Sequence, residues 1–163
     1  MTALGVFRDD FYNAVSALAQ TQFTATAQAT GTVLQATAIA GAGDCYIVAS
    51  GQAAVAFTTD SAINIIAQVQ NAVATAYKQG LGSFAAGVNP PPGVPNLFNM
   101  TWTLTINNQD TGAITLTGGA GVTLVGTNAG TIATVTSRVY VVTITSPTTV
   151  TMQSEGSFLS GAP

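Results

Sequence analysis

Residues 101–126, TWTLTINNQDTGAITLTGGAGVTLVG, alternate threonine with large apolar residues and contain a single charge, Asp110. In a β-strand, successive side chains point to opposite faces. Trp102, Leu104 and Ile106 therefore share one face, and the threonines between them share the other. Glycines and an Asn-Gln-Asp-Thr-Gly segment interrupt the alternation, as is typical of turns. The stretch predicts short strands that are joined by tight turns.

The same pattern extends nearly to the C-terminus. A compact hairpin is expected where GGAG separates residues 114–116 from residues 122–124. Further strands are expected at TIATV (131–135), RVYVVTIT (138–145) and TTVTMQ (148–153), with Ser146-Pro147 as the last turn. Short strands at this spacing indicate a mainly β fold, either an antiparallel β-sandwich or a jelly-roll-like barrel.

Two strands and a helix are expected before this region. CYIVAS (45–50) and AVAFT (54–58) read as a hairpin around Gly51-Gln52. The clearest helix is expected at about 60–79, capped by Thr59 or Asp60. Its apolar residues recur at intervals of three and four, so they form one face. That face consists of Ala62, Ile65, Ile66, Val69, Val73 and Ala76.

Two regions flanking these elements have less regular sequences. Residues 1–43 are expected to form an N-terminal arm and linker ahead of a β-rich domain at 44–163, although 21–41 also fits one or two irregular strands. The Pro-rich loop at 80–99 excludes regular structure. We expect it to make contacts, with a plain surface excursion as the alternative. Its candidate contact residues are Asn89, Pro90, Pro91, Pro92 and Pro95.

The N-terminal arm concentrates charged and aromatic residues. Six consecutive residues hold three of the nine charges and three aromatic side chains. Aromatic residues and Arg are favoured anchors in protein interfaces. We therefore expect this segment to bind a partner, and the alternative is a first helix capped by Asp10. The candidate contact residues are Phe7, Arg8, Asp9, Asp10, Phe11 and Tyr12.

Charge is scarce in this chain. Charged residues make up 6% of the sequence, whereas about a quarter is usual, and 26 residues are threonine. Interfaces lose charge at their centres, so such an exterior suits a subunit that is largely buried in an assembly. A soluble monomer that is merely rich in threonine is the alternative.

The scarcity of charge also bears on partners. Phosphate binding needs several Lys or Arg on one face, and this chain has three, so no nucleic acid partner is expected. No membrane segment is expected either, since no run of about 18 apolar residues occurs. Arg8, Asp9 and Asp10 interrupt the N-terminus before a signal-peptide core. We expect synthesis in a cytoplasm without export.

Catalytic chemistry has little support in the sequence. The chain has no histidine, which removes the commonest general base and the Ser-His-Asp arrangement. The six acids are sparse, and Asp44, Asp60 and Asp110 suit turns or a cap. Cys45 is the only cysteine, so no intrachain disulfide forms. We expect no enzyme, no catalytic residue, no cofactor and no metal site.

Three segments together resemble a known family. They are TDSAINIIAQ, TWTLTINNQDTGAITLTGGAGVTLVG and SRVYVVTITSPTTVTMQ, within residues 59–154. This combination resembles a module of tailed-bacteriophage virion proteins, particularly capsid decoration (cement) and head-fibre proteins. The start, GVFRDDFY, is also similar to the beginning of such proteins. The insertion at 88–95 is longer than the family pattern implies, so the role of that loop stays open.

The resemblance implies a decoration protein that binds the major capsid protein on the outer surface of a phage head and stabilises the head. It also implies a symmetric homo-oligomer, with a trimer preferred and a dimer next, and no catalytic residues. One alternative is a host- or glycan-binding module of a fibre or tail, which requires Trp102 or Tyr140 to be exposed. A minor-tail or adaptor subunit is the other.

Overall fold

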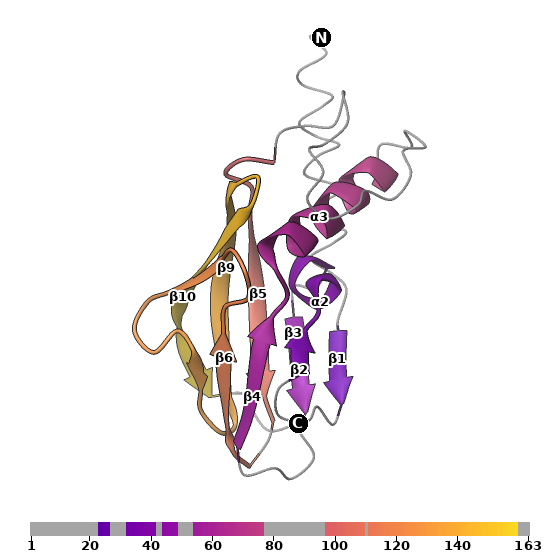
Figure 1. Ribbon diagram of the computed structural model, residues 1–163. Helices are drawn as coiled ribbons and strands as arrows, with labels where there is room; N and C mark the ends of the chain where they lie inside the picture. The colour runs from indigo at the N-terminus through magenta and orange to yellow at the C-terminus, as the bar shows by residue number, and fades with distance from the viewer. Residues whose placement is uncertain are drawn as a thin grey trace, which may run out of the picture.

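The computed structural model describes residues 23–26, 32–41, 44–48, 54–76, 97–109 and 111–159. Within these ranges the chain forms two sheets and two helices (Figure 1). The expectation of a mainly β fold is confirmed. The six-stranded sheet has the order β1 (Phe23–Thr26), β3 (Asp44–Val48), β5 (Thr101–Asn108), β9 (Thr136–Ser146), β10 (Thr149–Leu159) and β7 (Val122–Val125). The four-stranded sheet has the order β2 (Thr32–Leu34), β4 (Ala54–Thr59), β6 (Ala113–Thr117) and β8 (Thr131–Ile132).

The path of the chain differs from the expected hairpins. From β1 to β9, each described strand lies in the opposite sheet from the one before it. Among the described strands, only β9 and β10 are consecutive strands that form a hairpin, at the predicted Ser146-Pro147 turn. The hairpins expected at 45–58 and 114–124 are wrong, because each of these loops connects the two sheets. Asp44, which was expected in a turn, begins β3.

This path also explains why the sheets are mixed. Strands that are two apart in sequence become neighbours with the same direction, as in β1–β3–β5 and β2–β4–β6. β7 and β10 are parallel as well. Antiparallel pairing, expected throughout, joins only β5 to β9, β9 to β10 and β6 to β8. The alternation of apolar residues fixes which face is buried, but it is the same for a hairpin and for a crossing between sheets.

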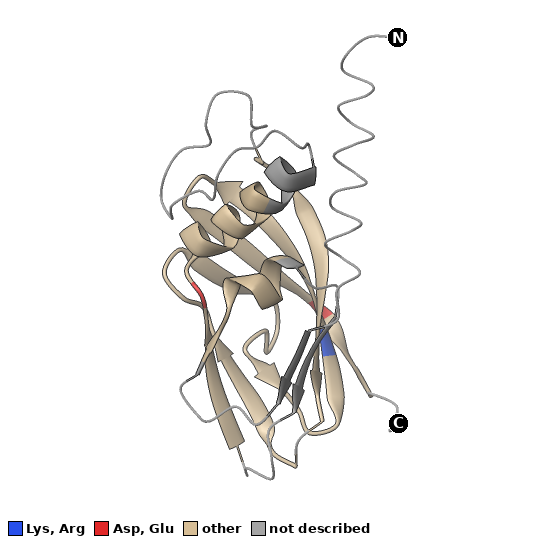
Figure 2. Ribbon diagram, turned by 90° about the vertical axis from the view of Figure 1, so that its right-hand side faces the viewer, with Lys and Arg blue, Asp and Glu red and all other residues tan. Residues whose placement is uncertain are grey.

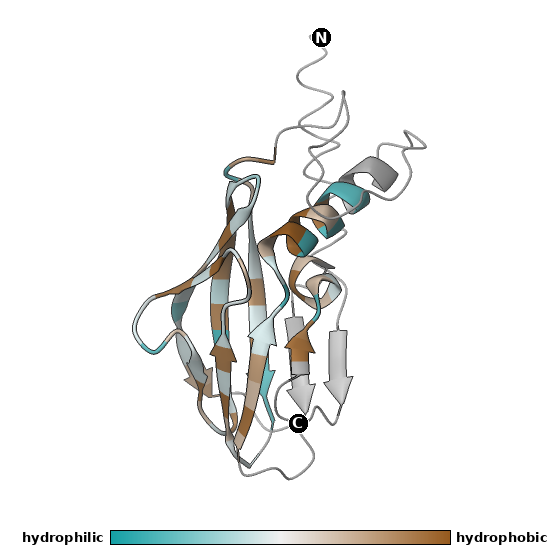
Figure 3. Cartoon of the chain, viewed as in Figure 1, coloured by the Kyte–Doolittle hydropathy of each residue, from teal (hydrophilic) through white to brown (hydrophobic). Residues whose placement is uncertain are grey.

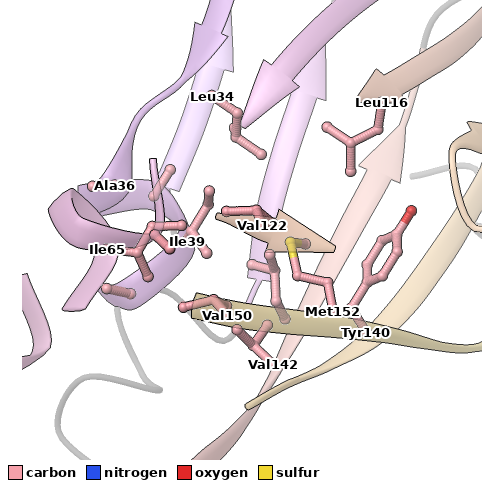
Figure 4. Packing of buried hydrophobic residues seen from close by; sticks show 14 of the residues in the cluster. Leu34, Ala36, Ile39, Ile65, Leu116, Val122, Tyr140, Val142, Val150 and Met152 are labelled. Atoms are coloured by element: carbon pink, nitrogen blue, oxygen red, sulfur yellow. The ribbon is translucent and has the colours of Figure 1, made fainter. Parts of the chain in front are cut away.

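The core lies between the sheets and beneath the helices. Strands carry alternating apolar and polar bands (Figure 3), and β4 alternates strictly between exposed and buried residues. Side chains of both sheets and both helices meet in one cluster (Figure 4). Its fully buried large members include Phe57, Ile39, Ile65, Leu104, Ile114, Tyr140 and Met152.

The helices α2 (Ala36–Gly41) and α3 (Ala62–Ala76) lie at one end of the sheets (Figure 1). In α3 the predicted face is buried at Ala62, Ile65, Ile66 and Val69. The cap is Ser61, whose Oγ accepts a hydrogen bond from the Asn64 backbone N–H at 3.3 Å. The expectation that Thr59 or Asp60 caps the helix is therefore wrong.

Residues 32–41 belong to this core instead of to a linker. Leu34 and Ile39 are buried, and α2 was not expected from the sequence. The predicted division of the chain at residue 43 therefore separates parts that pack together. The alternative interpretation, that residues 21–41 contain one or two strands, is the one that fits. β1 and β2 lie in this range, in different sheets.

The glycine-rich segment GGAG follows β6 and lies against the start of α3, where Gly119 has no room for a side chain. The Gly119 backbone N–H donates to Thr59 Oγ1 at 2.8 Å, and a Cβ at position 119 would lie 2.2 Å from the Thr59 carbonyl oxygen. Ala120 accepts a hydrogen bond from the backbone N–H of Ala62 at 2.8 Å. The segment thus carries the chain between the sheets and fastens the start of α3.

Candidate interaction surfaces

The two predicted contact sets lie outside the described residues. These are Phe7, Arg8, Asp9, Asp10, Phe11 and Tyr12 in the arm, and Asn89, Pro90, Pro91, Pro92 and Pro95 in the loop. The structure therefore does not test either set of predicted contacts.

Few charges stand on the described part of the chain (Figure 2). Among the residues whose side chains are described, they are Asp60, Arg138 and Glu155. Within the described ranges, no group of three or more His, Cys, Asp or Glu residues is placed to hold a metal ion. None of the helices described is long and apolar enough to cross a membrane.

The outer face of the six-stranded sheet carries two uncharged rows. In one, Thr101, Thr143, Thr151 and Thr123 are successive cross-strand neighbours on β5, β9, β10 and β7. In the adjacent row, Thr103, Val141, Gln153 and Val125 are neighbours on the same strands. These eight side chains are exposed or half-buried and point away from the core. We call this set the threonine–valine face.

The threonine–valine face offers methyl groups, hydroxyl groups and one amide, but no ionisable group. Removing it from water costs little compared with removing charged side chains. Asp44 stands in the following row, at the register position beside Thr105. The alternating sequence places the threonines on one side of each strand. It does not align them across four strands, since the pairing of β7 with β10 has no local signal in the sequence.

The opposite end of the sandwich from the helices has a polar interior. Asn108 is fully buried, and its Nδ2 donates to the carbonyl oxygens of Gly112 and Ile132 at 2.8 and 3.1 Å. The Ser137 hydroxyl donates to Asn107 Oδ1 beside it. The two bonds from Asn108 satisfy backbone carbonyls next to places where the chain passes between sheets, and so they stabilise these loops. Their chemistry is structural, since none of the groups is a nucleophile with a base.

Arg138 and Tyr140 are neighbours on the inner face of β9 at this end. Arg138 Nη1 donates to Ser154 Oγ at 2.7 Å, while its Nε is buried without a hydrogen-bond partner among the described residues. The Tyr140 hydroxyl donates to the carbonyl oxygen of Ala129 at 2.6 Å. Burial raises the pKa of Tyr140 to about 12, and the charge of Arg138 opposes this rise.

The two aromatic residues that a glycan site would need have internal roles. Tyr140 is fully buried. Trp102 is partly buried against the core, and its Nε1 donates to the carbonyl oxygen of Ile39 at 2.8 Å. Its indole therefore fastens α2 to β5. Neither side chain presents a free aromatic face together with its polar group to a sugar.

A second surface lies at the end of β10 and was not singled out from the sequence. Residues 155–159 are all exposed, including Phe158 at 52% and Leu159 at 80%. Val135, at 44% exposure, precedes Thr136, the cross-strand neighbour of Leu159. The alternating pattern in β10 ends before these residues, which is the signal that could have drawn attention to them.

Comparisons with known proteins give no neighbour: no family model, no curated protein and no solved structure matches this chain.

Proposed function

We propose that the protein is a virion structural protein that decorates the outer surface of a phage head and stabilises it. Its partners are the major capsid protein and further copies of itself, and it is made in the host cytoplasm. No enzymatic activity or cofactor belongs to this role. The class of function comes from the resemblance of residues 59–154 to decoration and head-fibre proteins.

The observation that carries the proposal is the threonine–valine face. Its two rows span four strands without a charge. Centres of protein interfaces are depleted in charge, and a sheet face offers a regular surface for packing. The aromatic arrangement does not favour the glycan-binding alternative, because Tyr140 is buried and Trp102 is hydrogen-bonded internally.

The test is co-sedimentation with cognate phage heads that lack the protein. Val141→Lys introduces a charge at the centre of the threonine–valine face, and we expect at least about a tenfold loss of affinity, equal to about 1.4 kcal/mol. Thr115→Lys is the matched control, because Thr115 is an exposed threonine on β6, in the other, four-stranded sheet. We expect this control to bind like the wild type.

A deletion of residues 1–12 examines the predicted arm in the same assay. Loss of binding by this deletion, with the unfolding free energy of the domain unchanged, supports the arm as a capsid contact. Normal binding by the deletion removes the arm from the proposal. If the wild-type protein itself fails to bind heads, decoration is the wrong function.

A further inference from the structure

The end of β10 leaves an open sheet edge. β9 pairs with β10 from Thr149 to Leu159, whereas β7 pairs with its other side only from Val150 to Gln153. The chain leaves the sheet after Val125 through Gly126, which has a φ of 115°. Beyond Gln153, no strand among those described covers the β7 side of β10.

This edge has only part of the usual protection against pairing. Natural sheet edges are blunted by Lys, Pro, bulges or a covering segment. Here a bulge-like register shift between Ser154 and Gly156 leaves Glu155 as an extra residue, and Gly156 has a φ of 134°, so the start of the edge is irregular. Beyond Gly156 the edge is regular, and no Lys or Pro follows up to Leu159. Exposed Phe158 and Leu159 add apolar area to the open backbone groups.

We propose that a second copy of this chain pairs antiparallel with residues 155–159, about a twofold axis at Ser157. Identical strands in antiparallel pairing are self-complementary, so one segment supplies both halves of the interface. The two six-stranded sheets would then continue into each other. This inference names the surface through which copies of the chain associate. It rests on the proposed function only in taking that association to occur on a phage head.

The side chains favour this register. With the axis at Ser157, Phe158 stands opposite the partner's Gly156, and Leu159 stands opposite the partner's Glu155. A Cβ at Gly156 would meet no atom within 4 Å, so the space there is open to an aromatic ring. Each Phe158 thus covers a glycine, and the two rings lie on the same face beside the axis.

The position of the Glu155 carboxylate also favours an axis at Ser157. Glu155 and the partner's Glu155 stand four residues apart along the paired strands, or roughly 13 Å at the strand rise. Repulsion at that separation is largely screened at physiological salt. An axis at Glu155 would instead place the two carboxylates opposite each other, which is destabilising.

A contact of five residue pairs is small for a stable dimer. Weak and transient complexes occupy the low end of interface areas. We therefore expect a dimer dissociation constant of about 1 μM or weaker. A disulfide bond across the interface should be able to trap such a dimer. A twofold axis corresponds to the dimer, which the resemblance puts second, and not to the preferred trimer.

The test uses the full chain with Ser157→Cys. Residues directly opposite in an antiparallel pair have Cβ atoms about 4.5–5.5 Å apart, so mild oxidation should join two copies. Wild type controls for Cys45, and Thr145→Cys controls for an exposed thiol at the other end of the hairpin. We expect disulfide dimers to form at least tenfold faster with Ser157→Cys than with either control.

Phe158→Ala in the Ser157→Cys background should slow the crosslinking several-fold, because it weakens the paired interface. If the thiols met only by random collision, this substitution would leave the rate unchanged. Sedimentation velocity of the wild type should show a concentration-dependent approach to a dimer. Crosslinking no faster than for Thr145→Cys, or a discrete trimer, would overturn the inference. A monomer that binds phage heads would contradict this inference alone, and a dimer that ignores them would contradict only the proposed function.

Discussion

Tyr140 links the chemistry of one side chain to the integrity of one end of the fold. Its ring fills the core between the sheets, and its hydroxyl satisfies the Ala129 carbonyl at 2.6 Å. Ala129 is itself buried in the loop that follows β7. An unsatisfied buried carbonyl costs more than the net value of the hydrogen bond, so the hydroxyl holds the loop as well as the strand.

The raised pKa of Tyr140 predicts a pH dependence of stability. The pKa is about 12 in the folded protein and 10 as the ordinary value, so folding favours the neutral phenol. This contribution is complete below pH 10 and is lost as the pH rises from 10 to 12. Unfolding in urea at pH 8, 10 and 11.5 measures the loss directly.

Tyr140→Phe provides the comparison for that series. It removes the hydroxyl, leaves the Ala129 carbonyl without this donor, and should cost about 1–3 kcal/mol of unfolding free energy at pH 8. Between pH 10 and 12 its stability should fall less steeply than that of the wild type. An equal slope in the two proteins would show that other tyrosines produce the effect.

Asp60 shows how one polar residue organises two elements. Its Oδ1 accepts hydrogen bonds from the Ser61 backbone N–H and from Asn64 Nδ2, both at 2.7 Å. Its Oδ2 accepts from the Ala36 backbone N–H at 3.2 Å, at the first residue of α2. A single carboxylate therefore satisfies donors at the N-terminal ends of both helices, where negative charge is also favourable.

Asp60→Ala should destabilise the protein by about 2 kcal/mol, because donors at both helix starts lose their acceptor. Thermal or urea unfolding gives the value. A double-mutant cycle with Asn64→Ala isolates the bond between the two side chains, and we expect a coupling of about 0.5–1 kcal/mol. Additive effects would mean that the carboxylate acts only through backbone donors.

The elements differ in how far the sequence predicts them. The face of α3 and the buried side of β5 follow from apolar periodicity alone, and both are confirmed at Ile65 and Leu104. The pairing of strands does not follow, since GGAG looks like a hairpin turn whether or not the chain returns to the same sheet. The threonine–valine face depends on that pairing, and so does the free edge of β10. Both surfaces become visible only when the register is known.

At the scale of the whole molecule, the alternating path makes most pairings non-local. Each strand from β1 to β7 gains a partner only after the chain has crossed to the other sheet and back. The β9–β10 hairpin is the exception, because Thr149 pairs with Ser146 across a short turn. Closing long loops before contacts form slows folding, so this topology favours a nucleus built around the hairpin and β5.

Folding kinetics can therefore separate the hairpin from the edge of the other sheet. Val150→Ala truncates a fully buried residue in β10, and Ile132→Val trims one in β8, the edge strand of the four-stranded sheet. Each should cost about 1 kcal/mol or more at equilibrium. We expect Val150→Ala to slow refolding, because its contacts form in the nucleus, and Ile132→Val mainly to speed unfolding. Stopped-flow refolding and unfolding in urea measures both rates. The reverse assignment would place the nucleus in the four-stranded sheet and would mean that the parallel crossings, rather than the one local hairpin, organise the chain first.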